Sequence, residues 1–523
     1  MNEVKSKKKK IITIVSTLIT ILLVTTCVYL ITNSNFSTDN KIKTNQKPKY
    51  SEYRLSGNSL EKFDLYFLQL ENDNQNKIYS PLSIKYALEM LSEGAKGETK
   101  AQLDDIIGEY EAKKYTNSKN ISFANALFIK NSFKDSINKK YFNSLINKYN
   151  AEIVYDDFKN ANTINKWVKN KTLNLISDVV TDDSAKQQDF ILTNALAVDM
   201  EWENTIQSQV GAKNSTHEYY VTYSHENYEE GIDTIHDDIY SKTKFNNKME
   251  AKAVEIGASI NKYDIVKTLG EENIRKTVGE EYEKWLKSGE SCSDEDPDVK
   301  TYLDDYIKSI NSNYNQLNVS TDFLFDNNDE VKVFAKDLKE YDGTTLQYIG
   351  IMPKQVSLEE YIKNVNVEKI NNIINNLKDV KLENFKEGVV TKITGYIPLF
   401  KFDYELNLTE DLKKLNVTNI FDKKKADLSG ISKGAVINTT THKANIEFSN
   451  EGIKAAAVTT LGGLGAQSCG FEYDYDVPVE TIDLTFNNPY MFLIRDKSSG
   501  EVWFTGTVFE PIEYQDIEFD EKE

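Results

Sequence analysis

The chain has 523 residues and a formal net charge of -19, from 82 Asp and Glu against 63 Lys and Arg. A polyanion of this size repels nucleic acid, which is therefore excluded as a ligand. The 3 Cys are too few for a disulfide-rich scaffold, and the 30 Tyr and 24 Phe supply a sizeable core, which excludes a chain disordered throughout.

The first 32 residues predict a signal-anchor. A basic tail, 1–10, precedes the segment 11–32, which runs for 22 positions without a charge. About 20 apolar residues cross the hydrocarbon core as a helix, and flanking Lys residues stay in the cytoplasm. We therefore expect one transmembrane helix, with the N-terminus cytoplasmic and the rest of the chain extracellular. The alternatives are a cleaved signal peptide, which gives a secreted protein, or lipid attachment at Cys27.

A tether rich in Asn, Ser, Thr and Lys follows at 33–55, and structured elements come after it. Apolar residues at helical spacing predict helices over Leu60 to Phe67 and Ile84 to Leu91, and Ser80-Pro81 is a start signal for the second. Runs of β-branched and apolar residues predict strands at Ile121 to Ile129, Phe190 to Met200, Gly395 to Phe402, Thr441 to Phe448, Thr481 to Phe486, Tyr490 to Arg495 and Val502 to Val508. Helices early and strands late indicate an α+β domain built on antiparallel sheets.

The segment 214–319 differs from its neighbours because it has few long apolar runs. Within it, Glu271 to Ser288 has a charged helical pattern, and Ser291 to Asp298 is an acidic patch. One interpretation is an inserted subdomain, and the other is a long solvated excursion with one or two helices.

Six separated segments, taken in order, are similar to those of one protein family. They are Ile78 to Thr99, Ile191 to Glu203, Ile397 to Phe402, Ile420 to Ser432, His442 to Thr460 and Phe486 to Pro511. Their order and spacing resemble a serpin over 56–213 and 320–515, with an acidic tail, 516–523, beyond. The resemblance implies helices plus three antiparallel β-sheets and an exposed reactive loop at 450–480. It does not account for 214–319.

A serpin is a single-use protease inhibitor rather than a turnover enzyme, so the resemblance implies neither catalytic residues nor a cofactor. The protease cuts the reactive loop as a substrate, and the cut loop enters a central sheet as a new strand before the acyl-enzyme is released. The implied partner is an endopeptidase at a cell surface. The Lys-rich tail and sparse cysteines favour a bacterial cell.

The N-terminal half of the loop has the composition that insertion requires. Its hinge comprises Glu451, Gly452, Ile453, Lys454, Ala455, Ala456, Ala457, Val458 and Thr459. Gly452 tolerates unusual backbone angles, and the alternate positions that begin at Ile453 carry no charge. The one charge, on Lys454, falls on the opposite face. Asn450 and Ile453 depart from the residues that the family usually has at these two places.

The family's spacing puts the scissile bond between Ala466 and Gln467. The wider window also includes Leu464, Gly465, Ser468 and Cys469. A small residue before the bond suits an elastase-like or subtilisin-like serine protease, or a papain-like cysteine protease. No Arg or Lys occurs from Leu464 to Phe471, which argues against a trypsin-like enzyme. The loop extension Gly470 to Glu480 alternates acids with aromatics, and is either an exosite or a solvated acidic bulge.

The resemblance also assigns gating residues in the central sheet. Those of a polar cluster beneath the sheet's centre are Ser80, Ser83, Asn194 and His442, and Trp202 matches an aromatic at the top of the sheet, where insertion begins. Taken alone, His442 is more typical of a structural histidine than a catalytic one. With four His in the chain and no His/Cys pair at ligand spacing, no metal site is predicted.

The sequence is compatible with three functions. The first is a membrane-tethered protease inhibitor, and the second is a non-inhibitory serpin-fold binding protein that acts through the insertion or the acidic loop extension. The third, a hydrolase using Cys469 and a His, is disfavoured because no nucleophile motif flanks this cysteine. Cys292 and Cys469 are either a disulfide pair or two free thiols.

Overall fold

The structure of the protein is a computed structural model. It describes residues 50–206, 241–288, 296–314, 317–319, 322–437, 441–450, 452–453, 471, 473, 475 and 477–515. The chain divides into two units, Met1–Tyr50 and Ser51–Glu523, and the second holds every element described below. Within these ranges, no helix has both the length and the apolarity needed to cross a membrane. The expected anchor, 11–32, and the acidic tail, 516–523, lie outside the described residues.

The first helices form where apolar periodicity and capping predict them. Helix α3 begins at Pro81, and the Ser80 hydroxyl caps it by accepting a hydrogen bond from the Ser83 backbone N–H at 3.1 Å. This confirms the start signal at Ser80-Pro81. The helices are α2 Lys62–Leu70, α3 Pro81–Ser92, α4 Gly97–Ile107, α5 Lys139–Tyr149, α6 Asn162–Lys171, α7 Asp182–Lys186, α8 Ile265–Leu269, α9 Glu271–Ser288, α10 Val299–Tyr314, α11 Leu358–Asn364, α12 Val367–Asn375 and α13 Leu408–Lys414.

A seven-stranded antiparallel sheet forms the centre of the core. Its strands in spatial order are β1 Lys77–Tyr79, β19 Val502–Val508, β18 Tyr490–Asp496, β11 Leu346–Pro353, β10 Val331–Asp337, β9 Leu324–Asn327 and β12 Lys378–Asp379. Strands β11 and β19 are buried along their whole length, because both faces of this sheet are covered.

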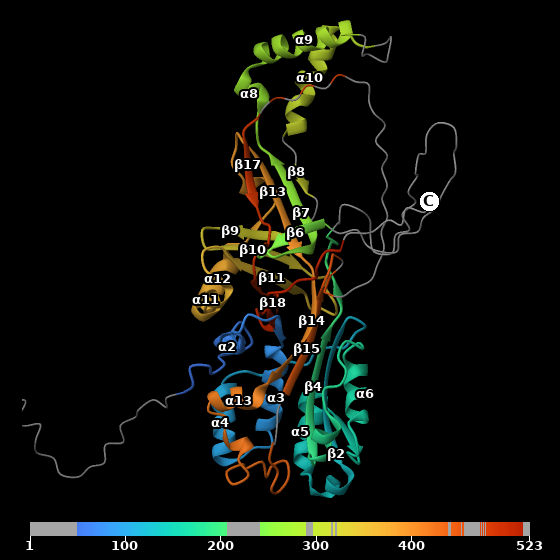
Figure 1. The fold of residues 1–523 in the computed structure, drawn as a ribbon, viewed down its shortest axis with the longest axis vertical. Coiled ribbons are helices and arrows are strands. Elements are labelled where there is room, and N and C mark those ends of the chain that lie inside the picture. Colours follow the sequence, from blue (N-terminus) through green and yellow to red (C-terminus); the bar gives the residue numbers. More distant parts are fainter. Residues whose placement is uncertain are drawn as a thin grey trace, which may run out of the picture. The chain divides into compact units, whose positions relative to one another are not determined.

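A five-stranded sheet lies beside it (Figure 1). Its strands are β17 Val479–Asp483, β13 Val390–Pro398, β7 Met249–Asn261 and β6 Ser241–Phe245, with β8 Leu317–Val319 also pairing with β7. Strands β13 and β17 run parallel, with Val390 opposite Val479.

One continuous segment of the chain contributes strands to both of the two smaller sheets. The three-stranded sheet comprises β3 Glu152–Asp156, β2 Ile121–Lys130 and β4 Phe190–Val198. The four-stranded sheet comprises β14 Phe400–Asn407, β15 Thr441–Phe448, β16 Gly452–Ile453 and β5 Met200–Glu201. Only Asp199 separates β4 from β5, so a single extended segment takes part in both sheets.

The expectation of three antiparallel β-sheets is therefore corrected: the described strands form four sheets, two of which contain a parallel pair. Strands β2 and β3 are parallel because α5 joins them as a crossover, and β13 pairs with β17 from far along the chain. The fourth sheet arises because, within the described residues, no ladder joins β4 to β15.

Three predicted boundaries also shift. The strand expected at Gly395 to Phe402 is two strands, because the chain leaves one sheet at Leu399 and enters another at Phe400. The strand expected at Thr481 to Phe486 is β17, which starts earlier and ends at Asp483. The expected insertion, 214–319, contributes β6, β7 and β8 to the five-stranded sheet, and its helical part is α8 to α10.

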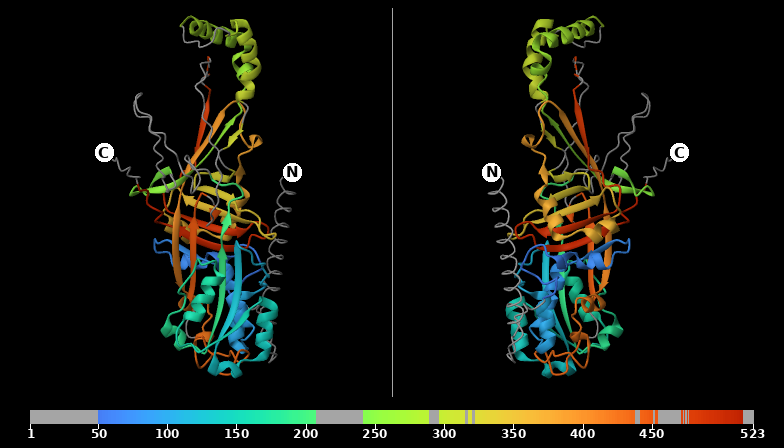
Figure 2. Two further views of the ribbon diagram at one scale, coloured as in Figure 1. Left: turned by 90° about the vertical axis from the view of Figure 1, so that its right-hand side faces the viewer. Right: turned by 90° about the vertical axis from the view of Figure 1, so that its left-hand side faces the viewer.

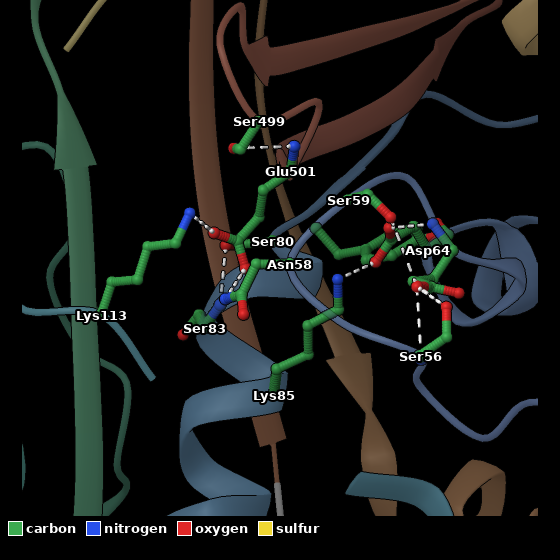
Figure 3. A network of polar contacts seen from close by, with 12 residues as sticks. Ser56, Asn58, Ser59, Asp64, Ser80, Ser83, Lys85, Lys113, Ser499 and Glu501 are labelled. Atoms are coloured by element: carbon green, nitrogen blue, oxygen red, sulfur yellow. Dashed lines mark hydrogen bonds and ion pairs between the residues drawn. The ribbon is translucent and has the colours of Figure 1, made fainter. Parts of the chain in front are cut away.

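A buried ion pair joins the first two helices of this body (Figure 3). The Nζ of Lys85 in α3 lies 2.6 Å from Oδ1 of Asp64 in α2, and both side chains are fully buried. Oδ2 of Asp64 accepts the Glu61 backbone N–H at 2.8 Å. Burial raises the pKa of Asp64 to about 6, although Lys85 acts in the opposite direction.

We predict that Lys85→Met lowers the free energy of unfolding by about 3–5 kcal/mol, because it leaves a buried carboxyl group without its partner. Urea unfolding at neutral pH measures the change. Lys62→Met is the matched control, because Lys62 pairs with Glu52 at the surface and an exposed ion pair contributes at most about 1 kcal/mol. Equal effects of the two substitutions would contradict the prediction.

Candidate functional site

Among the described strands, no ladder pairs β4 with β15, and we call the space between these two strands the β4–β15 slot; Figure 1 shows where the strands lie. A cavity of about 390 Å³ lies along it, lined by β4, by β15, by α3 and by the segment that follows α6. A smaller cavity continues between Val198 and Ile446. Two strand edges that face a cavity, and do not pair with each other, leave room for one more strand between them.

The two-residue strand β16 occupies the upper end of this slot. Ile453 pairs with Phe448 of β15 on one side and with Met200 of β5 on the other, and Gly452 pairs with Glu201. Both pairings are antiparallel, so β4–β5 and β15 run in the same direction. A chain that continued beyond Ile453 in this direction would enter the slot with antiparallel pairing to both edges.

Gly452 is required here by lack of space. A Cβ atom on it would lie 2.2 Å from the Met200 carbonyl oxygen and 2.6 Å from the Cα of Glu201. Its φ is not positive, so the close approach of two backbones, rather than an unusual dihedral angle, explains the glycine. This corrects the reason that the sequence suggested for it.

The turn between β15 and β16 is held by its own backbone. The Ser449 N–H donates to the Gly452 carbonyl oxygen at 3.0 Å, and the Ser449 hydroxyl donates to the same oxygen at 3.1 Å. The Ile206 N–H donates to the carbonyl oxygen of buried Asn450 at 2.8 Å. The hinge therefore leaves β15 through a tight turn that these hydrogen bonds hold.

Trp202 lies directly above this hinge and is fully buried. Its indole N–H donates to the Ser449 carbonyl oxygen at 2.9 Å, and its ring packs edge-on against Phe448 and Tyr348. Because Trp202 contacts the turn as well as the core, any movement of the hinge disturbs its packing. Its predicted role at the start of insertion stays a prediction.

The four polar residues predicted beneath the sheet lie together at the lower part of the slot. Their hydrogen bonds connect α3, β4 and β15. The Ser80 N–H donates to Nε2 of His442 at 2.9 Å, and the Ser83 hydroxyl donates to Oδ1 of Asn194. Helix α3 is thus tied to both edges of the slot. The role of this cluster in gating stays a prediction.

Sequence reasoning missed one member of this network, Asn125 in β2. Its Oδ1 accepts from Nδ2 of Asn194 at 2.7 Å, and its own Nδ2 donates to the Tyr149 carbonyl oxygen at 2.8 Å. The signal was present, because Asn125 is the one amide in the middle of a largely apolar strand, and a buried amide requires partners.

His442 accepts a hydrogen bond at Nε2, which requires a neutral imidazole at this position. Burial lowers the pKa of His442 to about 4. The same ring lines the cavity of the slot together with Asn194. These observations fit a structural histidine that holds the slot's edge rather than a catalytic base.

Only some of the remaining predicted residues lie within the described part of the chain. Of the hinge, Gly452 and Ile453 are described, whereas Glu451 and Lys454 to Thr459 lie outside the described residues. So do the predicted scissile bond, Ala466–Gln467, its whole window, and Cys292. Across the described ranges, no group of three or more His, Cys, Asp or Glu is placed to hold a metal ion.

Comparisons with known proteins agree on one family. The family model of the serpins, described as serine protease inhibitors, matches residues 62–257 and 300–511. Human neuroserpin is 23% identical over 475 residues, which cover 85% of this chain and 88% of that protein. Human leukocyte elastase inhibitor is 24% identical over 481 residues, which cover 88% of this chain and 100% of that protein.

Solved structures show the same fold. The thermophilic serpin tengpin in its native state superimposes with a TM-score of 0.54 at 21% identity, over 87% of this chain and 96% of that one. Thyroxine-binding globulin in complex with thyroxine gives a TM-score of 0.52 at 16% identity, over 86% of this chain and 97% of that one.

We predict that His442 makes the protein less stable in acid. The unfolded chain binds a proton at this side chain near pH 6.5, whereas the folded chain resists protonation until about pH 4. The free energy of unfolding therefore falls as the pH falls through this window, by about 3 kcal/mol in all. Chemical unfolding at a series of pH values measures it.

His442→Gln is the control, because a glutamine oxygen can still accept from the Ser80 N–H but does not titrate. Asp64 and Asp411, whose pKa burial raises to about 6, act in the opposite direction in both proteins, so the difference between the two curves isolates His442. Identical pH profiles would show that His442 is not kept neutral by the fold.

Proposed function

The chain belongs to the serpin family of protease inhibitors, and from that premise we propose that it traps a serine endopeptidase covalently by inserting its cleaved reactive loop into the β4–β15 slot. The nucleophile of the protease attacks the carbonyl carbon of the scissile residue, the peptide C–N bond breaks, and the nitrogen leaves as the amine of a new N-terminus. The loop that remains joined to the protease as an acyl ester then enters the slot as a strand.

The observation that carries this proposal is the position of β16. Gly452 and Ile453 already pair with both edges at the top of the slot, and no described strand fills the slot below them. Insertion therefore extends an existing strand and needs no new nucleus. Each added residue gains backbone partners on both sides.

The register of β16 supports the predicted inward face. Directly opposite residues share a face of a sheet, and Phe448, which lies opposite Ile453, is buried in the core. If β16 continued downward in this register, three inward residues would lie opposite three described residues of β15. These pairs are Ala455 with Ile446, Ala457 with Ala444, and Thr459 with His442.

The outward face fits as well. In an inserted strand of the same register, Lys454 would lie opposite Glu447, so the one charge of the inserting segment would meet an opposite charge. A small or apolar residue on every inward position, and a complementary charge outward, are what a strand entering a closed core needs.

The target and location extend the proposal beyond the family. Ala466 and Gln467 are the proposed scissile pair, so the target has a small primary pocket, as in elastase-like or subtilisin-like serine proteases or papain-like cysteine proteases. The name of leukocyte elastase inhibitor, a relative of this chain, agrees with that class. We place the inhibitor on the outside of a cell membrane, anchored through 11–32.

A second candidate function is a serpin-fold protein that binds a partner without trapping a protease. Helices α9 and α10 favour it, because they add a surface beyond the sheets. The obstacle that the sequence suggested at Ile453 does not favour it, because Ile453 already pairs with Phe448 and Met200. In this case a protease cuts the loop but leaves no complex.

The deciding experiment mixes the full chain with elastase-like, subtilisin-like, trypsin-like and papain-like proteases, followed by denaturing electrophoresis and mass spectrometry. We expect a covalent complex with one class of small-pocket protease, and a released peptide that identifies the scissile bond. Cleavage without any complex would support the binding protein instead.

We predict that Gly452→Ala raises the number of inhibitor molecules consumed for each trapped protease by roughly tenfold. A small change in the activation free energy of loop insertion, relative to that of protease release, is enough for this effect. The added Cβ would collide with the backbone of Met200 and Glu201, so β16 would lose its pairing and insertion would start late. Titration of the protease measures the ratio.

Gly57→Ala is the matched control, since a Cβ on Gly57 has no atom within 4 Å. Both variants remove one glycine and add one methyl group, but only one of them touches the hinge. Undiminished trapping by Gly452→Ala would show that the hinge does not need this close approach.

A further inference from the structure

Helices α9 and α10 form a helical hairpin that lies beyond the ends of β13 and β17 (Figure 1, Figure 2). Ile274 and Val278 of α9 pack with Leu303 and Ile310 of α10 in a small separate core. The helices come close at Gly279, where a Cβ would lie 3.2 Å from Cδ1 of Leu303. The hairpin has its own apolar contacts.

This hairpin holds the segment that follows the reactive loop, which we call the distal leg. Its described residues are Phe471, Tyr473, Tyr475 and Val477, and all four pack into the core of the hairpin. They alternate along the sequence, as do residues on one face of an extended chain. The distal leg leads directly into β17, which starts at Val479.

Two tyrosines of α10 bind the backbone of the distal leg. The Tyr302 hydroxyl donates to the Phe471 carbonyl oxygen at 3.2 Å, and the Tyr306 hydroxyl donates to the Tyr473 carbonyl oxygen at 2.8 Å. Residues four apart on a helix are separated by about 6 Å, and residues two apart on an extended chain by about 6.6 Å. The hairpin and the distal leg therefore match in spacing.

Aromatic packing adds to these hydrogen bonds. The Phe471 ring meets Tyr282 of α9 edge-on at 5.3 Å between centroids and Tyr302 of α10 at 5.7 Å. Tyr282 and Tyr302 stack on each other at 4.0 Å. Phe471 is thus held by both helices, at the point where the reactive loop ends.

We propose that the hairpin is a clamp on the distal leg, which lets the loop enter the β4–β15 slot only after cleavage. The proposal rests on the loop insertion proposed above. Such a clamp is needed because the slot offers an intact loop the same backbone partners as a cut one. An intact loop that had entered the slot would no longer be available to a protease.

The number of residues between β16 and the clamped Phe471 limits how far an intact loop can reach. In the register of β16, residue 460 lies opposite Thr441, the first residue of β15, when the slot is filled to its lower end. Ten residues, 461–470, then remain before the clamped Phe471. Fully extended, the 11 steps from residue 460 to Phe471 reach at most about 40 Å.

The distance to be covered is greater. Strand β14 continues below β13 (Figure 1), and the pair Val390–Val479 marks the start of β17, while Asn407–Thr441 marks the lower end of the slot. From Val390 to Asn407 the chain makes 17 residue steps through β13, Leu399 and β14, and because the two strands continue in one direction (Figure 1), these steps cover about 55 Å. With Phe471 held, the intact loop cannot reach the lower end of the slot. If the distal leg is released, residues 461–478 reach about 60 Å, which suffices.

The test compares four full-length proteins in detergent: wild type, the double variant Phe471→Ala/Tyr473→Ala, Tyr306→Phe, and the control Val479→Ala. Val479 is half-exposed in β17, outside the aromatic contacts of the clamp. The intact proteins are incubated below their unfolding temperature. The fraction that becomes resistant to urea is followed over time, with mass spectrometry to show that the chain is uncut.

We expect the double variant to convert about tenfold faster than wild type. It lacks the two aromatic rings that hold the distal leg, so the activation free energy for releasing the distal leg is lower. Tyr306→Phe, which keeps the ring and loses only the hydrogen bond to Tyr473, should convert two- to threefold faster, and Val479→Ala at the wild-type rate. After cleavage of the loop, all four should gain the same resistance to urea.

Two other results overturn the proposal in distinguishable ways. If cleavage stabilises all four proteins but the double variant and Tyr306→Phe convert no faster than wild type, the clamp is refuted and loop insertion stands. If cleavage stabilises none of them, loop insertion itself is refuted, and the clamp with it.

Discussion

The structure depends on one missing set of hydrogen bonds, those between β4 and β15. The two strands run in the same direction with facing edges, and in the described chain only the two residues of β16 lie between them. Unpaired backbone edges inside a protein are unfavourable, so the sheet gains stability when a strand fills the space. The loop insertion proposed above would fill this space.

Three groups of contacts hold the edges of the slot and the two ends of the loop, and they differ in physical kind. At the top, Gly452 permits two backbones to come within contact distance, and Trp202 packs over the turn. At the bottom, Ser80 and Ser83 connect the two edges to α3 through His442 and Asn194. At the far end of the loop, the hairpin holds the distal leg through aromatic rings. The first two involve the strands of the slot, and the third involves the distal leg.

Much of the local structure could be predicted from particular residues. Ser80-Pro81 marks the start of α3, the charged pattern over Glu271 to Ser288 coincides with α9, and the run Thr441 to Phe448 coincides with β15. The polar cluster could be named only through the family resemblance, because nothing in the local sequence brings Ser80 near His442. Asn125 and the clamp were missed, since their partners are distant in sequence.

The sequence by itself determined which segments are helical or extended, because capping, periodicity and side-chain branching act over a few residues. Only the tertiary structure decided how the strands pair. It divided the segment around Leu399 between two sheets, made β13 and β17 parallel, and left β4 and β15 apart. It also decided why residue 452 is a glycine. These features depend on which distant edges meet in space, and that is set by packing of the whole chain rather than by any local pattern.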